Sequence, residues 1–252
     1  MLLHGLVGSS NYWGAAYDPL AESHRLVVPD LLGFGRSPRP EHGYTPDDHV
    51  RALVSCLDDL DFHEPAVIAG HSLGVLIAVH LAATHPERVS GIVGFGPPLY
   101  PDRGAALQHV GATSPMGRLF VLPGRTAEVA CRWVCEHRKL AARLATLTHP
   151  SLPRPIAADS VQHTWASYSQ TLENVILSTA ANASLHRAEC LMRFVAGDRD
   201  RVVDLPYLRR LRSPSAQVEL EEWRGGHDLP LSHAPACAEM IRRVADQHGI
   251  AR

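Results

Sequence analysis

Two short apolar runs separated by a helical stretch constrain the fold of this chain most. Pro65 to Gly70 (PAVIAG) is predicted to be a buried strand, because the run is short, apolar and ends in a glycine turn. A helix is predicted from about Ser72 until Pro86 stops it. Val89 to Phe95 is a second apolar strand. A strand, a helix and a strand with short links predict parallel strands in a sheet that helices cover on both faces.

The same alternation recurs towards both ends of the chain. Arg25 to Asp30 (RLVVPD) is predicted to be a further buried strand, and strands return at Leu191 to Ala196 and at Gln217 to Trp223. A helix is predicted to begin after Thr45, where a capping residue precedes a proline and two aspartates. A closing helix is predicted from about Pro235 to Gln247. The predicted fold class is α/β, with a mostly parallel sheet flanked by helices.

The middle of the chain has a different character. From about Pro97 to Arg187 no strong strand pattern occurs, and helical stretches include Ala127 to Leu144 and Val161 to Ser178. We interpret residues 97–188 as a helical cap inserted into one α/β core, which consists of residues 1–96 and 189–252. A chain of 252 residues is long enough to bury such a core.

Charge and composition exclude several classes of partner. The formal net charge of -2 gives no long-range field for nucleic acid or anionic lipid, and the arginines are dispersed. No apolar run is long enough to span a bilayer, and no charged-then-apolar leader opens the chain. The five cysteines, an odd number without a secretion signal, indicate reduced thiols in a cytoplasmic protein. We expect a small-molecule substrate, with neither nucleic acid nor a membrane as partner.

One cysteine pair raises the question of a metal site. Cys131 and Cys135 are one helical turn apart, with His137 nearby. A structural metal site would need a second pair of ligands, which the sequence does not offer. None of the 16 histidines falls in a recognised ligand spacing. We therefore expect no metal and no organic cofactor.

The chemistry is expected at Gly70-His71-Ser72-Leu73-Gly74. The G-x-S-x-G pattern is weak alone, but here a strand ends at its first glycine and a helix begins at its serine. Such a turn strains the serine, and the glycines let neighbouring backbone approach. The helix N-terminus favours developing negative charge at Ser72, the predicted nucleophile. The alternative is a turn with an idle serine. His71 is predicted to be structural, because it would point away from the apex of the turn.

A nucleophilic serine needs a base, and the base needs an acid that orients it. Gly225-Gly226-His227 and Gly197-Asp198-Arg199-Asp200 each follow a predicted strand. Both segments therefore lie at carboxyl ends of parallel strands, where such folds bind ligands. His227 is the predicted base. Asp198 and Asp200 share one loop, only one of them can reach His227, and Asp200 is favoured. Three poorer candidates for the acid, adjacent to the base or on other loops, are Asp228, Asp204 and Asp30.

Taken in order, these motifs resemble those of the α/β-hydrolase superfamily. They are His4 to Ser9 (HGLVGS), Asp30 to Ser37 (DLLGFGRS), Gly70 to Gly74, Gly197 to Asp200, and Gly226-His227. The chain order of serine, aspartate and histidine is also the order of that fold. Within the superfamily, the chain is similar to the branch of capped esterases, haloperoxidase-like proteins and carbon–carbon hydrolases. The resemblance covers residues 1–96 and 189–252 well, and covers the insertion only by position and helical character.

The resemblance implies a role for each matching residue. It makes Ser72 the nucleophile and His227 the base, and the second acidic position of the family's G-x-x-D loop corresponds to Asp200. The residues after His-Gly and after the nucleophile, Leu6 and Leu73, would donate backbone N–H groups to an oxyanion. Relatives that dehalogenate or open epoxides carry aspartate at the elbow, so a serine argues against both reactions.

The start of the sequence departs from the family pattern. The family normally has two strands and a full third strand before His-Gly, but only Met1, Leu2 and Leu3 precede it here. N-terminal strands therefore look absent, and a misassigned start or truncated clone is favoured over natural loss. Arg25 to Asp30 would then form an exposed sheet edge. Because exposed edges invite pairing with another chain, we expect that edge to be capable of forming oligomers.

The resemblance and the motifs together predict a carboxylic ester hydrolase. The substrate would be a small to medium, apolar ester, lactone or thioester, cleaved through an acyl-enzyme. Aromatic and apolar side chains of the insertion could line its pocket, or could instead pack the cap's own helices: Met116, Leu119, Phe120, Leu122, Trp133, Trp165 and Tyr168. Two alternatives remain. One is a carbon–carbon hydrolase of a vinylogous diketone with the same triad, and the other is a slow-turnover, hydrolase-like ligand receptor.

Overall fold

A parallel sheet forms the centre of the molecule. The computed structural model describes residues 1–112, 124–148, 152–212 and 217–247. Five strands pair in parallel in the order β1-β2-β3-β4-β5. They are β1 (Leu2–Leu3), β2 (Ala66–His71), β3 (Val89–Phe95), β4 (Leu191–Gly197) and β5 (Val218–Trp223). The predicted α/β class is confirmed.

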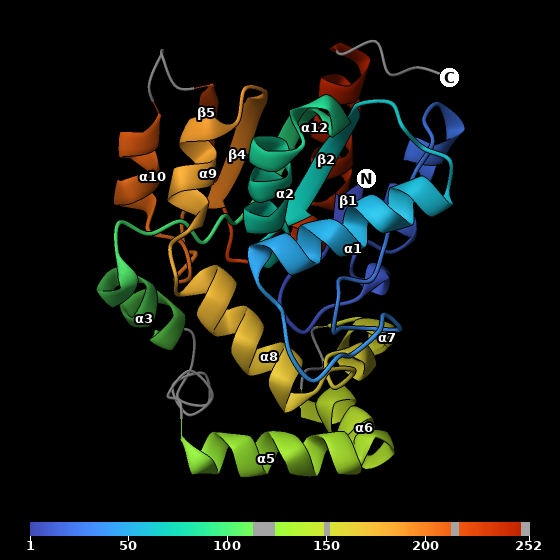
Figure 1. The fold of residues 1–252 in the computed structure, drawn as a ribbon, viewed down its shortest axis with the longest axis vertical. Coiled ribbons are helices and arrows are strands. Elements are labelled where there is room, and N and C mark those ends of the chain that lie inside the picture. The colour runs from blue at the N-terminus through green and yellow to red at the C-terminus, as the bar shows by residue number, and fades with distance from the viewer. Residues whose placement is uncertain (113–123, 149–151, 213–216, 248–252) are drawn as a thin grey trace.

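Helices cover both faces of this sheet (Figure 1). One face carries α1 (Pro46–Asp59), α2 (Leu73–Thr84), α9 (Ala181–Arg187) and α10 (Leu205–Leu211), and the other carries η2 (Ala15–Glu22) and α12 (Ala234–Gln247). Side chains alternate between the two apolar cores along β1 to β4. In β3, Ile92 packs in the core of α2, whereas Val93 and Phe95 pack in the core of α12. Both faces of β1 to β4 are therefore buried, as expected for parallel strands, whereas β5 at the edge exposes Glu219, Glu221 and Glu222.

The helix after Thr45 begins as its sequence predicts. The Thr45 side chain accepts the backbone N–H of Asp48 at 3.2 Å, and the Asp48 carboxylate accepts the backbone N–H of Thr45 at 3.1 Å. This reciprocal cap fixes the start of α1. By contrast, α2 is apolar on nearly every side, because it is enclosed between the sheet, α1 and α9.

The prediction of a strand at Arg25–Asp30 is wrong. The segment runs beside β1, and the Leu2 N–H donates to the Val27 carbonyl at 2.9 Å, but it is half-buried and forms no strand. Pro29 lacks an N–H group, so a continuous ladder with β1 cannot develop. A small hollow beside it is lined by apolar side chains that include Leu20 and Phe62. Association through this edge stays a prediction.

The helices between β3 and β4 gather mostly on one side of the molecule, below the sheet in Figure 1. They are α3 (Arg103–Gly111), α5 (Arg125–Glu136), α6 (Arg138–Thr148), α7 (Arg154–Asp159), α8 (Trp165–Thr171) and the π-helical turn η4 (Leu172–Ile176). The next helix, α9, falls inside the range predicted as cap but packs beside α2. The exact limits of the cap stay a prediction. No helix among the described residues is long and apolar enough to cross a membrane.

Candidate active site

The turn between β2 and α2 holds Ser72 in a backbone conformation that is rare for a residue with a side chain. Its φ is 51° and its ψ is −116°. Its N–H donates to the Phe95 carbonyl at 2.9 Å, which ties the turn to β3. A Cβ at Gly70 would lie 2.6 Å from the backbone of Gly74, and a Cβ at Gly74 would lie 2.4 Å from the Leu3 carbonyl oxygen. Both glycines are therefore required for this turn to fit against β1.

His227 and Asp200 meet beyond the ends of β5 and β4. Their Nδ1 and Oδ2 atoms are 2.8 Å apart, and the Asp200 carboxylate is fully buried, with 0% exposure. Its other oxygen accepts the N–H groups of Val202 at 2.9 Å and Val203 at 3.4 Å. Burial alone would raise the pKa of Asp200, but the hydrogen bonds and charge of its partners hold that pKa below the ordinary value. A fixed carboxylate on Nδ1 leaves Nε2 of His227 as the basic nitrogen.

Asp198, the other acidic residue of this loop, has a different partner. Its Oδ1 accepts the backbone N–H of Gly225 at 2.9 Å, which braces the loop before the histidine. Gly96 packs on the other side of the pair, where a Cβ would lie 3.0 Å from Nδ1 of His227 and 3.3 Å from Oδ2 of Asp200. Of the two acids weighed from the sequence, the structure brings Asp200 to the base.

His4 organises the loop that carries Leu6. It is completely buried, its Nε2 accepts the Leu31 N–H at 2.9 Å, and its Nδ1 therefore donates to the Gly5 carbonyl at 2.7 Å. Burial lowers the pKa of His4 to about 4, so the ring is neutral at neutral pH and can both donate and accept. Leu73 is the first residue of α2, and its N–H belongs to the first helical turn, whose N–H groups have no partner within the helix.

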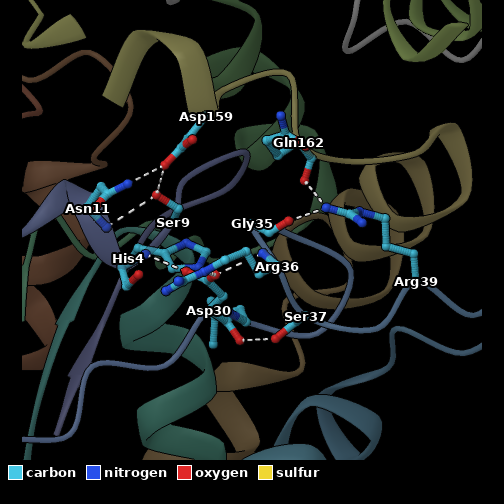
Figure 2. Close-up of polar contacts among 12 residues, drawn as sticks. His4, Ser9, Asn11, Asp30, Gly35, Arg36, Ser37, Arg39, Asp159 and Gln162 are labelled. Carbon is cyan, nitrogen blue, oxygen red and sulfur yellow. Dashed lines mark hydrogen bonds and ion pairs between the residues drawn. The ribbon is translucent and has the colours of Figure 1, made fainter. Parts of the chain in front are cut away.

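Asp30, considered above as a poorer candidate for the acid, braces the same loop instead (Figure 2). Its two oxygens accept the backbone N–H groups of Ser10 at 2.6 Å and Arg36 at 2.8 Å. Gly35 has a φ of +54°, and a Cβ there would collide with the Asp30 carboxylate at 2.4 Å. The aspartate and glycine of the DLLGFGRS motif therefore join two loops rather than take part in chemistry.

Asp159 holds this loop from the side of the inserted helices. It is the last residue of α7, and its Oδ2 accepts hydrogen bonds from the Ser9 hydroxyl at 2.6 Å and from the Asn11 side-chain amide at 2.7 Å (Figure 2). The loop that carries Leu6 is consequently fixed by the core and by the insertion together.

A cavity of about 390 Å³ joins these groups. Leu6, Ser72 and His227 line it from the core, and Ile156, Leu172 and Ile176 line it from the inserted helices. Its surface is mostly apolar with a few convergent polar groups, the character expected of a small-molecule site.

Of the predicted pocket residues, Tyr168 lines this cavity. Trp165 packs beside Tyr168, with ring centroids 6.1 Å apart, but is not part of the lining. Trp133 is 43% exposed on the outer side of α5, in a separate hollow. Because Ala127 and Cys131 face inwards, a residue two positions after Cys131 is turned roughly 200° away. Four predicted residues lie outside the described residues: Met116, Leu119, Phe120 and Leu122.

The expected orientation of His71 is wrong. Its ring lines the cavity, stacks on Tyr12 with centroids 4.6 Å apart, and lies 4.8 Å from the ring of His227. Its Nε2 donates to the His227 carbonyl at 3.1 Å. Burial, together with the neighbouring His227, lowers the pKa of His71 to about 3, so this ring is neutral. Its contacts support the backbone of the base.

Asp228 is a cavity residue that the sequence reasoning missed. It lines the cavity, and its Oδ1 accepts the Tyr12 hydroxyl at 3.1 Å. It stands at the N-cap position of α11 (Leu229–Ser232), yet its side chain makes no capping hydrogen bond. The one sequence signal for Asp228 is its position directly after His227, and that position argues against a role as the triad acid.

The cysteine pair has a different neighbour from the one the sequence suggested. Cys131 lies 3.6 Å from Nε2 of His163, whereas Nδ1 of His137 faces the Trp133 carbonyl at 3.0 Å. All five cysteines are unpaired thiols. Within the described ranges, no group of three or more histidine, cysteine or acidic residues is arranged to hold a metal ion.

The fold and this geometry agree with a known family. The family model described as the α/β-hydrolase fold matches residues 1–233, so the chain belongs to that family. The structure of an E-2-(acetamidomethylene)succinate hydrolase superposes with a TM-score of 0.73 and 20% identity, over 97% of this chain and 90% of that chain. The esterase RhEst1 from Rhodococcus sp. ECU1013 gives a TM-score of 0.72 and 20% identity, over 97% and 89% respectively.

A similar sequence is the probable lysophospholipase BODYGUARD 4 of Arabidopsis thaliana. It is 27% identical over 256 residues, which cover 92% of this chain and 60% of that protein. The chain therefore spans less than two thirds of the length of this relative.

Proposed function

We propose that the protein is a serine hydrolase that cleaves small to medium, apolar carboxylic esters, lactones or thioesters through an acyl-enzyme. The observation that carries the proposal is the 2.8 Å contact of His227 Nδ1 with the buried Asp200, at the cavity that Ser72 also lines. A strained serine, a basic imidazole nitrogen and an oriented acid at one cavity are the parts that acyl transfer needs.

In the first step, Nε2 of His227 takes the proton of the Ser72 hydroxyl while Oγ attacks the substrate carbonyl carbon. The carbonyl π electrons move to its oxygen, and the backbone N–H groups of Leu6 and Leu73 stabilise that oxyanion. A donor of this kind contributes roughly 3–4 kcal/mol to the rate. The buried Asp200 carboxylate stabilises the imidazolium of His227 without accepting its proton.

In the second step, the tetrahedral intermediate collapses and the bond to the leaving oxygen or sulfur breaks. The imidazolium of His227 gives its proton to the leaving group. A water then attacks the acyl-enzyme with His227 again as the base, which releases the acid and restores Ser72. His227 returns the proton of that water to Oγ of Ser72 as the acyl–oxygen bond breaks, so every proton is accounted for by His227, Ser72, the leaving group or water.

The cavity supports an apolar substrate of limited size. Ile156, Leu172 and Ile176 form an apolar wall opposite the serine, and about 390 Å³ accommodates a short acyl or alcohol chain. The names of two similar proteins, an esterase and a probable lysophospholipase, agree with an ester as the bond class.

Steady-state hydrolysis of p-nitrophenyl esters from acetate to octanoate tests the reaction type. We expect saturable turnover of roughly 1 s⁻¹ or more, with Ser72→Ala as the inactive control. Cleavage of a vinylogous diketone without ester turnover would favour a carbon–carbon hydrolase instead. Tight ligand binding with turnover below about one per minute would favour a receptor.

A further inference from the structure

The cavity has an uneven balance of charged side chains. Among its described lining residues, Asp228 is the one carboxylate, and there is no arginine or lysine. Two imidazoles complete the ionisable groups of this wall, His71 and the proposed base His227. A substrate that carries its own charge therefore meets, in the described part of the wall, one acidic group and no fixed cation.

Asp228 is held so that its carboxylate faces this space. The Tyr12 hydroxyl donates to Oδ1 at 3.1 Å, which fixes the side chain beside the cavity. The Asp228 side chain makes no capping hydrogen bond to the N-terminus of α11, so its carboxylate remains available to the cavity. Among the described residues, Oδ2 of Asp228 has no hydrogen-bond partner, and no arginine or lysine pairs with either oxygen.

The nearest imidazole does not neutralise this carboxylate. Nε2 of His71 lies 4.0 Å from Oδ1, at the limit of an ion pair, and donates instead to the His227 carbonyl at 3.1 Å. His71 is neutral, because its burial opposes a positive charge. Tyr12 lies in the same wall, with its ring stacked on His71.

We propose that Asp228 selects substrates by charge. A substrate with an ammonium group is preferred, a neutral apolar substrate is accepted, and a substrate with a carboxylate near the scissile bond is rejected. This inference rests on the proposed function and narrows its substrate class. Because the Asp228 side chain is 53% exposed, solvent weakens these interactions, and each charge is expected to change a binding constant by roughly two- to fivefold.

Three butanoyl thioesters whose leaving thiols share a two-carbon spacer and end in a cationic, a neutral or an anionic group test this selection. They are butyrylthiocholine, its uncharged isostere 3,3-dimethylbutyl thiobutanoate, and S-butanoyl-3-mercaptopropanoate, and a thiol reagent follows the release of each. For the wild type we expect kcat/KM for the cation to exceed that for the anion by roughly tenfold. In Asp228→Asn, which keeps an oxygen for Tyr12, the cation-to-anion ratio should fall to within about twofold. The neutral thioester is the reference within each variant.

Asp198→Asn is the matched control, because it removes a nearby carboxylate that does not line the cavity, and it should keep the wild-type ratio. Rising salt should lower the ratio in the wild type, which tests the same charge without any substitution. Equal ratios in wild type and Asp228→Asn, or a ratio that salt does not change, would overturn the inference. If none of the three thioesters is cleaved and Ser72 resists a fluorophosphonate, the proposed function itself fails, and the selection with it.

Discussion

At the scale of single residues, two aspartates of one loop have different partners and therefore different expected roles. Asp200 contacts the imidazole of His227, whereas Asp198 accepts a backbone N–H of Gly225. Asp200→Asn should lower kcat by roughly 10³- to 10⁴-fold, because an amide no longer fixes the tautomer that leaves Nε2 basic. Asp198→Asn, the matched change, should lower kcat by no more than about threefold. Steady-state ester hydrolysis compares kcat of the two variants. Similar losses of kcat in both would contradict the claim that only Asp200 orients His227.

The residues of the candidate triad could be predicted from sequence because each follows a strand end. Parallel strands bring their carboxyl ends to one edge, so Ser72, Asp200 and His227 converge whatever the loops do. Tyr12 and Asp228 could not be predicted in this way. Their side chains reach the cavity because of the paths of a 3-10 turn, η1 (Ser10–Tyr12), and of the loop after His227. Local spacing carries no information about such paths.

At the scale of elements, α7 links the substrate cavity to the loop that carries Leu6. Ile156 of α7 lines the cavity, and Asp159 at its end binds Ser9 and Asn11. Removing Asp159 should loosen the oxyanion loop, since hydrogen bonds to a charged group contribute about 1.5–3 kcal/mol. We expect Asp159→Ala to lower kcat/KM by roughly tenfold, and Asn11→Ala to lower it less.

A double-mutant cycle separates this link from two independent effects. Because Asn11 acts through Asp159, the double variant should be no worse than Asp159→Ala alone. Losses that multiply in the double variant would show that the two residues act separately. Ser72 labelling by a fluorophosphonate gives the active fraction of each variant, so a folding defect is not mistaken for a loss of rate.

The elements predicted from sequence were those with a continuous apolar pattern. The strand from Val89 to Phe95 and the closing helix are confirmed because their whole length is buried on one or both sides. Arg25–Asp30 has the composition of a strand, but its proline and its position at the edge leave it with one backbone hydrogen bond to β1, from the Leu2 N–H to the Val27 carbonyl. Composition alone could not reveal this, because pairing depends on the neighbouring chain.

At the scale of the whole molecule, buried neutral histidines set the response of stability to acid. Burial lowers the pKa of His4, His49 and His163 to about 4 and, with its neighbour His227, lowers that of His71 to about 3. The unfolded chain binds these protons near pH 6.5, so the stabilisation is complete above that pH and is lost as pH falls towards the folded-state pKa values. At pH 5.5 each histidine should reduce the free energy of unfolding by about 1 kcal/mol.

Urea unfolding at pH 7.5 and 5.5 measures this loss. We expect the free energy of unfolding to drop by several kcal/mol between the two values. His49→Gln keeps a polar partner for Thr171. Its free energy of unfolding should drop less than that of the wild type between the two pH values, and the difference should equal about the contribution of one histidine. Equal stability at both pH values would contradict burial of these rings in the neutral form.

The central claim is that Ser72 is an activated nucleophile, and covalent labelling tests it most directly. Folded protein would be incubated with a fluorophosphonate, digested and analysed by mass spectrometry. The account predicts a phosphonyl adduct on the peptide that contains Ser72, its absence in Ser72→Ala, and labelling at least 100-fold slower in His227→Ala. Folded protein that stays unlabelled, or an adduct on another serine, would contradict the assignment of the site.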